Sequence, residues 1–298
     1  RSAGLRHRKP LPRRANRLPI SSTQHRDVIM KYEDFQFLKF DRPDPGVLLI
    51  TINRPEVMNA TNARLHWELT QIWAVISDDD DTRVAVITGA GDRAFSAGGD
   101  LSWVETIVGH PDVVAGVHKE AADVVYKMLD CDKPIISAIN GTAVGAGLAV
   151  AMIADISIMS ETAKLTDGHV RLGVGAGDHA AIIWPLLCGM AKAKYYLMTA
   201  DFIDGKEAER IGLVSLAVPA DQLMPKALDV ARKLSQGSQT AIKFTKKSLN
   251  NWLRQAGPIF DASLAMEMIC FLSPDAKEGV DAVRNKRPAK FPSANPAK

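Results

Sequence analysis

The stretch KPIISAINGTAVGAGLAVAMIADISI, Lys133 to Ile158, decides the fold of this chain. Its first part, as far as Asn140, is short, apolar and rich in isoleucine, which is typical of a buried strand. The glycine-rich turn GTAVGAG follows, and LAVAMIA after it has the composition of a buried helix. DISIMS then indicates another buried strand. The stretch therefore predicts a strand–turn–helix–strand unit of the kind that builds an α/β core.

The apolar run from Pro134 to Ala154 is long enough to suggest a membrane span. Asn140 and several glycines interrupt the run, and the charged residues Lys133 and Asp155 flank it. We therefore predict that the run is buried inside the protein and that the chain has no membrane partner.

Alternating strand and helix patterns continue on both sides of this unit. Val47–Pro55 and Arg83–Gly91 have the pattern of buried strands, and Leu65–Ile76 has apolar residues on one helical face. Gly212–Pro219 predicts one more strand. After Ala220 the sequence becomes helical, in DQLMPKALDVARKLSQ and SLAMEMICFLSPDAKEGVDAVRNKR. The predicted fold class is α/β with a C-terminal helical layer.

Composition limits the class of protein. The 298 residues are 46% hydrophobic and 24% charged, which is ordinary for a globular chain. The three cysteines are too few for a disulfide framework, so a reducing, cytoplasmic location is the expectation. No His/Cys cluster has the spacing of metal ligands along the chain, and we predict no metal site.

The positive charge is concentrated at the N-terminus. Residues 1–29 contain eight Lys/Arg and one Asp, a local charge of +7; because the whole chain carries +3, the remainder carries −4. This segment could be a targeting signal, a basic arm for nucleic acid, or upstream sequence that precedes a start at Met30. We expect a disordered or non-native tail, and a nucleic-acid partner is the less favoured interpretation.

Two glycine-rich turns, FSAGGDL and NGTAVGAGLA, each follow a predicted strand and precede a predicted helix. The first N–H groups of a helix have no internal acceptor, and glycine lets a ligand approach the backbone closely. Two such turns side by side would direct two N–H groups at one oxygen atom, which defines an oxyanion hole. The alternative is that the glycines only allow close packing. Neither turn has the order of a dinucleotide-binding fingerprint.

The ordered combination of NRPEVMNA, AFSAGGDL and KPIISAINGTAVGAGLAVAMIADISI resembles the crotonase, or enoyl-CoA hydratase/isomerase, superfamily. The resemblance runs from about Met30 to Phe291. It implies a crotonase-like ββα spiral core over residues 30–220. It also implies a helical region over residues 221–298 that completes the CoA pocket and builds a homotrimer or a dimer of trimers.

The resemblance further implies an acyl-CoA substrate, with coenzyme A as part of the thioester and no permanently bound cofactor. The oxyanion donors would be the backbone N–H groups of Gly99 and Ala146, although the family usually has glycine at the second position. Val283 replaces a phenylalanine usual in the family, and from its position Asp100 is expected to cap the following helix. The positions matched to CoA contacts are Glu56, Val57, Met58, Ala60, Ala97, Asp100, Leu101 and Lys286.

The acid–base positions depart from the family pattern. Where hydratases of this family carry two glutamates, this chain has Ala149 and His169. His169 stands nine residues before Asp178, with a glycine-rich turn between them. An imidazole can exchange a proton near neutral pH, and a carboxylate can fix its tautomer, so we predict that His169 is the general acid–base and that Asp178 orients it. The alternative is a buried structural histidine beside a turn-forming aspartate.

The remaining titratable residues of interest receive plainer interpretations. Asp167 and His179 are expected in solvent or behind the catalytic groups, and His66 on the surface of its helix. Glu267 is within possible reach of the site, but we expect it on a solvated helix face.

The predicted function is an acyl-CoA enzyme of the enoyl-CoA hydratase/isomerase type. A His–Asp pair at this spacing also resembles the C–C bond hydrolases that open β-diketones, so retro-Claisen cleavage of a β-diketone or a β-ketoacyl-CoA is a second hypothesis. Those hydrolases have a histidine beside the oxyanion position, where this chain has Ala146. An RNA-binding or catalytically inactive acyl-CoA-binding relative is the third.

Overall fold

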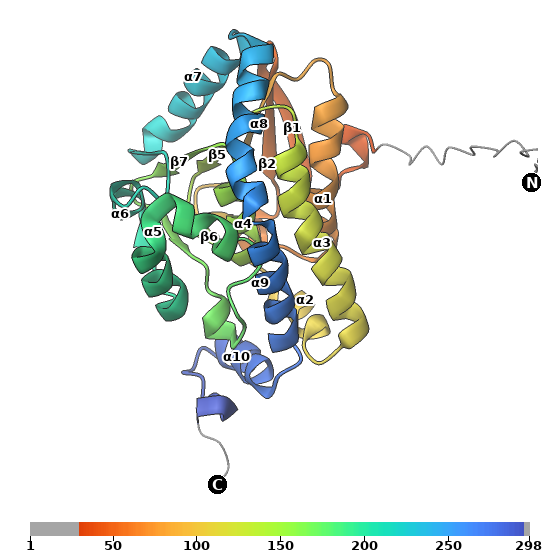
Figure 1. Ribbon diagram of the computed structural model, residues 1–298, viewed down its shortest axis with the longest axis vertical. Helices are drawn as coiled ribbons and strands as arrows, with labels where there is room; N and C mark the ends of the chain where they lie inside the picture. Colours follow the sequence, from red (N-terminus) through yellow and green to blue (C-terminus); the bar gives the residue numbers. More distant parts are fainter. Residues whose placement is uncertain (1–29, 295–298) are drawn as a thin grey trace, which may run out of the picture.

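The computed structural model describes residues 30–294, which form two β-sheets surrounded by helices (Figure 1). The predicted basic tail, residues 1–29, lies outside the described residues. The larger sheet consists of β1 (Leu38–Asp44), β2 (Val47–Ile52), β3 (Val84–Gly89), β5 (Ile135–Ile139), β7 (Ile156–Ser160) and β10 (Leu216–Val218), in that order. The smaller sheet consists of β4 (Ala94–Ser96), β6 (Thr142–Val144), β8 (Lys164–Thr166) and β9 (Ile203–Asp204).

The chain alternates between the two sheets. β3 is followed by β4, β5 by β6 and β7 by β8, so each pair places one strand in each sheet. These strands pair in parallel with their neighbours, whereas β1 runs antiparallel to β2 and β9 antiparallel to β8. The helices of this part are α1 (Ala63–Asp78), α2 (Leu101–Ile107), α3 (Pro111–Asp130), α4 (Gly145–Ile153), α5 (Ala180–Thr199) and α6 (Gly205–Arg210). The arrangement confirms the predicted α/β class with its strand–strand–helix repeat.

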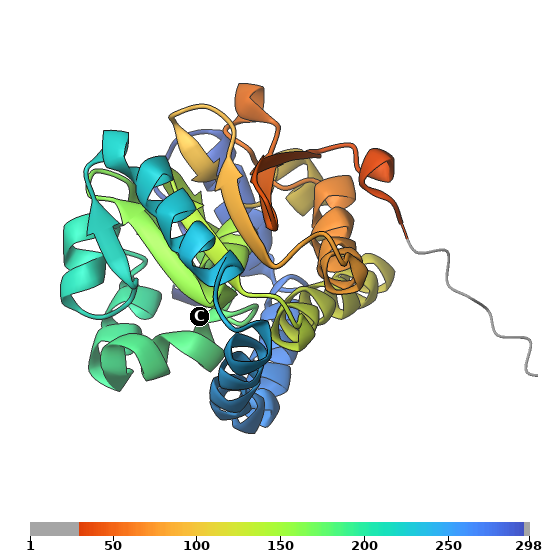
Figure 2. The same ribbon diagram turned by 90° about the horizontal axis from the view of Figure 1, so that it is seen from above.

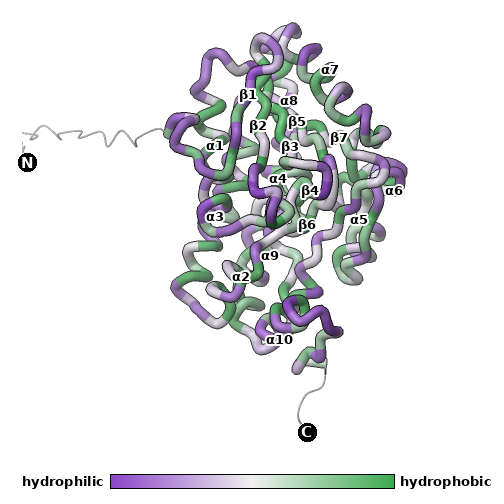
Figure 3. The backbone as a smooth tube through the Cα atoms, turned by 180° about the vertical axis from the view of Figure 1, so that it is seen from behind, coloured by the Kyte–Doolittle hydropathy of each residue, from purple (hydrophilic) through white to green (hydrophobic). Residues whose placement is uncertain are grey.

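Successive residues of the larger sheet point to opposite faces, because side chains alternate along a strand. Ile87 and Ile135 face the main core with α1, α3 and α4, whereas Val86 and Ile136 face a second, smaller core. Helix α7 (Leu223–Ser235) covers that second core with Leu223, Ala227 and Ala231. Figure 3 shows the consequence: hydrophobic segments run through the interior, and hydrophilic ones cover many outer turns.

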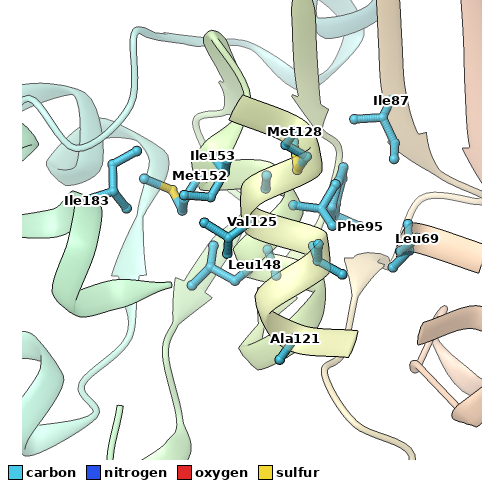
Figure 4. Close-up of a cluster of buried hydrophobic side chains, with 14 of the residues drawn as sticks. Leu69, Ile87, Phe95, Ala121, Val125, Met128, Leu148, Met152, Ile153 and Ile183 are labelled. Carbon is cyan, nitrogen blue, oxygen red and sulfur yellow. The ribbon is translucent and has the colours of Figure 1, made fainter. Parts of the chain in front are cut away.

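Helix α4 lies at the centre of the main core. It is apolar all round, as expected for a helix without a solvent face, and Leu148 and Met152 are buried among side chains from α3 and β4 (Figure 4). Its first turn lies against β4 with only the Ser96 side chain between the two backbones: a Cβ added at Gly147 would lie 2.2 Å from the Cβ of Ser96. Only glycine allows this approach, so the beginning of α4 is held directly against the end of β4.

The C-terminal helices run one after another along the long axis of the molecule in Figure 1: α8 (Gln239–Gln255), α9 (Gly257–Cys270) and α10 (Pro274–Arg284). Figure 2 shows α8 beside α3, and both α8 and α9 contact α3. Helix α10 packs on the 3-10 turn His169–Leu172, where a Cβ on Gly279 would lie 2.3 Å from the backbone of Leu172. The C-terminal layer therefore closes over the segment that carries His169.

The structure differs from the sequence prediction in several places. β1 and the four strands of the smaller sheet were not expected. The strand expected over Gly212–Pro219 is limited to Leu216–Val218. Helices α5 and α8 were not expected as separate elements. The single helical pattern after Ser263 is two helices, because Ser273 caps α10 and Pro274 begins it. No helix among residues 30–294 is both long and apolar enough to cross a membrane.

The contact between α4 and β4 can be tested with Gly147→Ala. Alanine normally favours a helix by about 1 kcal/mol over glycine. At this position the added methyl group would lie 2.3 Å from the Ser96 hydroxyl oxygen, so the free energy of unfolding should instead fall by about 1–3 kcal/mol. Denaturant unfolding measures the change.

Gly116→Ala in α3 is the matched control, because no atom lies within 4 Å of its added Cβ, and it should not destabilise the protein. Adding Ser96→Gly to Gly147→Ala should recover part of the loss, which a double-mutant cycle would reveal. A Gly147→Ala variant as stable as the Gly116→Ala variant would contradict the proposed close approach.

Candidate active site

A cavity of about 610 Å³ opens where the turns at the ends of β4 and β6 meet the C-terminal helices. Its walls come from α1, α2, α3, the start of α4, the 3-10 turn and α9. Most lining side chains are apolar, among them Trp103, Val104, Ile107, Val117, Ala121, Leu172, Met268 and Phe271. The titratable lining residues are His66, Asp100, Asp167, His169, Arg171, Asp178 and Glu267.

The two predicted glycine turns lie side by side in one wall. β4 and β6 pair in parallel, which brings the ends of both strands to the same edge of the smaller sheet. Gly98 and Gly145 both have positive φ angles, +92° and +49°, which favour glycine. A Cβ on Gly145 would lie 3.8 Å from the Gly98 Cα and 3.9 Å from the His169 Cε1. Both turns and the imidazole therefore meet at one point.

The residues that follow these glycines each carry a backbone N–H without an acceptor among the described residues. Thr61 pairs with the carbonyl of Gly98 and with the N–H of Asp100, which leaves the N–H of Gly99 between them unpaired. Ala146 is in the first turn of α4, where N–H groups have no intrahelical acceptor. Both residues line the cavity. Both N–H groups therefore lie at the cavity wall without an acceptor, and their role as an oxyanion hole stays a prediction.

His169 lies buried among three carboxylates. Its Nδ1 is 2.9 Å from Asp167 Oδ1, whereas its Nε2 is 3.8 Å from Asp178 Oδ2 and 3.6 Å from Glu267 Oε1. The left-handed conformation of Gly168, with φ of +78°, leads into the 3-10 turn that presents the ring. Asp167 fixes the tautomer by accepting a hydrogen bond from Nδ1, so Nε2 faces the cavity and the other two acids.

These charges shift the pKa values of the cluster. Burial by itself lowers the pKa of His169, but the charges of Asp167, Asp178 and Glu267 outweigh it and hold that pKa well above the ordinary 6.5. Burial raises the pKa of Glu267 well above its ordinary value, with Asp178 adding to the effect and His169 opposing it. Burial also favours a raised pKa at Asp178, but His179 and His169 outweigh it and lower the pKa. The cluster thus combines an ionised Asp178 with two groups that titrate above their usual ranges.

Several sequence predictions need correction here. The expected partner of the His169 ring was Asp178, but His169 Nδ1 is hydrogen-bonded to Asp167. Asp178 Oδ1 is hydrogen-bonded to His179 Nδ1 instead, at 2.6 Å. Asp167 and His179 are both buried, so a solvent position for either is wrong.

Glu267 was expected on a solvated face, but it is 3% exposed and reaches the imidazole from α9. Its position is fixed by close contact: a Cβ on Gly177 would lie 2.8 Å from the Glu267 Cβ, and the Gly177 carbonyl accepts a hydrogen bond from Ser263. His66, expected on the surface, is 4% exposed and lines the cavity.

The burial of Glu267 could have been predicted from the sequence. Glu267 has the helical spacing of Phe260, Leu264 and Phe271, which are all buried. An acid in the middle of such an apolar face is directed inward.

The positions matched to CoA contacts divide into two groups. Those that line the cavity are Val57, Ala60, Ala97, Asp100 and Leu101, and those that do not are Glu56, Met58 and Lys286. The carboxylate of Asp100 caps α2 through the N–H of Ser102, at 3.1 Å, and pairs with Arg54 at 3.2 Å. The structural role expected for that carboxylate is confirmed.

The cluster also contains the types of side chain that bind metals. The ligand atoms of His169, Asp178 and Glu267 lie within 4.8 Å of one another, as do those of Asp167, Asp178 and His179. The prediction of no metal site considered spacing along the chain, which cannot detect ligands brought together from the 3-10 turn, the following loop and α9.

Comparison with known proteins gives consistent results. The family model described as enoyl-CoA hydratase/isomerase matches residues 42–294. A crotonyl-CoA hydratase of Syntrophomonas wolfei is 31% identical over 267 residues, which are 88% of this chain and 99% of that protein.

Two solved structures are similar as well. An enoyl-CoA hydratase/isomerase of Mycobacterium paratuberculosis has a TM-score of 0.78 and 34% identity, covering 82% of this chain and 97% of its own. A β-diketone hydrolase of the cyanobacterium Anabaena, bound to (S)-3-oxocyclohexyl acetic acid, has a TM-score of 0.75 and 27% identity, covering 81% and 96%.

The electrostatics of the ring can be tested with Asp167→Asn. This change removes the negative charge nearest to Nδ1 but keeps an oxygen that can accept its hydrogen bond, so the pKa of His169 should fall towards its ordinary value. An NMR titration of the His169 ring in both proteins measures this pKa. Asp112→Asn, an exposed change on α3, is the control and should leave the titration unaltered. An unchanged or higher His169 pKa in Asp167→Asn would contradict the stated cause.

Proposed function

The chain belongs to the enoyl-CoA hydratase/isomerase family of the crotonase superfamily, and from this premise we propose that it adds water to 2-enoyl-CoA thioesters. The observation that carries the proposal is the pair of unpaired amides at Gly99 and Ala146 beside the His169 ring. The family supports an enzyme of the hydratase/isomerase kind. The residues and the reaction below are our inference.

In the proposed reaction the thioester carbonyl oxygen accepts hydrogen bonds from the N–H groups of Gly99 and Ala146. Addition of water to the β carbon moves electrons onto this oxygen, so the two donors stabilise the transition state more than the ground state. A donor of this kind is worth about 10²–10³ in rate. The apolar walls of the cavity exclude water and strengthen both hydrogen bonds.

Glu267 and His169 divide the proton transfers in this proposal. Ionised Glu267 removes a proton from water, whose oxygen bonds to the β carbon. The electrons of the double bond move through the α carbon onto the thioester oxygen, and the enolate returns them as the α carbon takes a proton from His169 Nε2. The raised pKa of Glu267 makes its carboxylate a stronger base than usual, and the raised pKa of His169 keeps the ring protonated. Ionised Asp178 positions the water.

The apolar lining of the cavity favours an apolar acyl group, and its lining residues indicate one route for coenzyme A. Trp103, Ile107 and Phe271 are among its apolar lining residues, and Val57 and Leu101 line it as well. We infer that the pantetheine part passes Val57, Ala60 and Ala97 on its way to solvent. Lys286 is exposed beyond α10, and its proposed contact with the CoA phosphates depends on the bound conformation.

Retro-Claisen cleavage is a second candidate, favoured by the similarity to the Anabaena β-diketone hydrolase. In that reaction water adds to a carbonyl carbon, the bond to the neighbouring carbon breaks, and the resulting enolate takes a proton from His169. A carboxylic acid and a ketone, or the corresponding thioester, are the products. The amides of Gly99 and Ala146 would stabilise the enolate in this reaction as well, and His169 and Glu267 would again exchange the protons.

The two candidates are separated by giving the protein crotonyl-CoA in one assay and a cyclic 1,3-diketone in another. Loss of the enoyl absorbance with appearance of the 3-hydroxyacyl thioester supports hydration. Ring opening of the diketone without hydration would contradict the first candidate and support the second.

The role of Glu267 can be tested with Glu267→Gln, which is expected to lower kcat for hydration by about 10²–10⁴-fold because the base is lost. Since the carboxylate must be ionised, wild-type activity should fall as the pH decreases through its raised pKa. The variant should lack this decrease. Glu209→Gln, an exposed change on α6, is the control. Wild-type kcat in Glu267→Gln would exclude Glu267 as the base.

We also propose the homotrimer or dimer of trimers implied by the family. Apolar side chains are exposed on α5, α8 and α9: Leu186, Leu187, Met190, Leu249, Trp252, Met266 and Ile269. Light scattering after gel filtration should give a multiple of three subunits for the wild type. The double variant Leu249→Lys, Trp252→Glu should shift the mass towards one subunit, whereas the exposed Lys226→Glu on α7 should not. A wild-type monomer would contradict the proposal.

A further inference from the structure

Three polar side chains of the cavity face one another at distances too long for hydrogen bonds. His169 Nε2 lies 3.6 Å from Glu267 Oε1 and 3.8 Å from Asp178 Oδ2. A hydrogen bond between such atoms has a length of about 2.7–3.2 Å. Each of the three residues nevertheless has one ligand atom within 4.8 Å of those of the other two. The three atoms therefore surround a common point in the cavity wall.

This spacing matches the ligand shell of a small divalent cation. Zn²⁺ binds imidazole nitrogen and carboxylate oxygen at about 2.0–2.2 Å, so two ligands at a tetrahedral angle are about 3.3–3.6 Å apart. The distance from His169 Nε2 to Glu267 Oε1 falls within this range, and the distance to Asp178 Oδ2 is slightly longer. A cation at the common point would contact all three atoms after a small adjustment of the side chains.

Two of these residues are held in place through their other polar atom. His169 Nδ1 lies 2.9 Å from Asp167 Oδ1, and Asp178 Oδ1 lies 2.6 Å from His179 Nδ1. In metal sites a histidine ligand usually donates its second ring N–H to a carboxylate, and ligating carboxylates are hydrogen-bonded in turn. The outer partners of a metal site are thus present, and they leave His169 Nε2 and Asp178 Oδ2 free to bind a cation.

Glu267 provides an independent observation that points to a ligand. Its side chain is 3% exposed, and its Oε2 has no hydrogen-bond partner among residues 30–294. Asp167 Oδ2 is a second buried oxygen of the cluster without such a partner in that range. Buried charges in proteins are usually paired or bound to metals, because an unpaired buried charge is costly. A dication would offset the negative charge that these carboxylates bring together.

A second group of possible ligands, Asp167, Asp178 and His179, suits a cation less well. Asp178 Oδ1 and His179 Nδ1 are already hydrogen-bonded to each other. His179 is also fully buried and does not line the cavity, whereas His169, Asp178 and Glu267 all do. A cation that enters from the cavity therefore reaches these three residues first.

We propose that His169 Nε2, Asp178 Oδ2 and Glu267 Oε1 bind a divalent cation of the zinc class, with further coordination positions open to the cavity. One imidazole and two carboxylates suit Zn²⁺ or Co²⁺ better than Mg²⁺, which prefers oxygen ligands in an octahedron. The cation needs the lone pair of Nε2, so any proton on this nitrogen passes to solvent when the cation binds.

The cation-bound cluster cannot carry out the proposed hydration, because His169 and Glu267 then bind the metal with the atoms that would transfer protons. Zn²⁺ is therefore expected to inhibit that reaction. This consequence rests on the proposed function, whereas the binding of the cation does not.

The test measures Zn²⁺ binding to the full chain by competition with a chromophoric chelator. X-ray absorption at the zinc edge then identifies the ligands. The wild type should bind Zn²⁺ through nitrogen and oxygen at about 2.0–2.2 Å, with no sulfur at about 2.3 Å. Excess Mg²⁺ should not displace the bound Zn²⁺.

Glu267→Gln removes an anionic ligand and should lower the affinity for Zn²⁺ by more than about 100-fold, since loss of an outer partner alone costs about 10–100-fold. Asp167→Asn keeps all three ligands and removes only the charge behind Nδ1, so a decrease of about 10–100-fold is expected. This second variant provides a test even if Glu267→Gln does not fold. His110→Asn and Glu209→Gln, exposed changes before α3 and on α6, should bind Zn²⁺ like the wild type.

Failure of the wild type to bind Zn²⁺ would overturn the site, and so would unchanged affinity in both Glu267→Gln and Asp167→Asn or a ligand shell that contains sulfur. Loss of crotonyl-CoA hydration in the zinc-saturated protein, with recovery after chelation, supports both the site and the proposed function.

Two outcomes separate the site from the proposed function. Zn²⁺ binding with the expected response to the variants, in a protein that hydrates no enoyl-CoA with or without the cation, would contradict the proposed function and support the site. Undiminished hydration by the zinc-saturated protein would likewise support the site and contradict the proton-transfer roles of His169 and Glu267.

Discussion

The site depends on one packing constraint: the first turn of α4 lies against the end of β4 with only the Ser96 side chain between the two backbones. Gly147 makes this possible, because a Cβ there would overlap Ser96, and Gly98 and Gly145 bring the two turns together with their positive φ angles. β3 and β5 pair in parallel in the larger sheet, and the chain passes from them into β4 and β6, which pair in parallel in the smaller sheet. The two turns that follow β4 and β6 therefore lie at the same edge of the smaller sheet. Two amides without acceptors are the direct consequence.

The electrostatic part of the site comes from elements distant in sequence. Asp167 and His169 belong to the segment after β8, Asp178 precedes α5, and Glu267 belongs to α9. Three buried acids around one imidazole are unfavourable unless the ring is protonated. The negative charges of these acids therefore raise the pKa of His169. The C-terminal layer thus contributes to the candidate site as well as to packing, since Glu267 of α9 reaches the imidazole and α10 packs on the turn that presents His169.

Sequence reasoning reached the α/β class, five of the six strands of the larger sheet and the two glycine turns because these depend on local patterns: short apolar runs, turn residues and helix starts. His169 was singled out through the family resemblance; it lines the cavity, and its catalytic role stays a prediction. Sequence reasoning misplaced Glu267 and His66, whose burial depends on which helix face meets the core. In both cases the helical spacing was informative: Glu267 follows Phe260 and Leu264, and His66 precedes Trp73 on the same face of α1. The choice between Asp167 and Asp178 as the partner of the ring could not be made from spacing, since it is decided by the left-handed turn at Gly168.

The central claim is that the amides of Gly99 and Ala146 converge on one carbonyl oxygen beside the His169 imidazole. A crystal structure with an unreactive acyl-CoA analogue tests it most directly. We predict that the thioester oxygen lies about 3 Å from both backbone nitrogens, with His169 Nε2 and Glu267 on the same side of the acyl chain as its α and β carbons. A thioester oxygen that contacts neither amide, or an acyl chain that leaves His169 and Glu267 on the far side of the cavity, would contradict the claim.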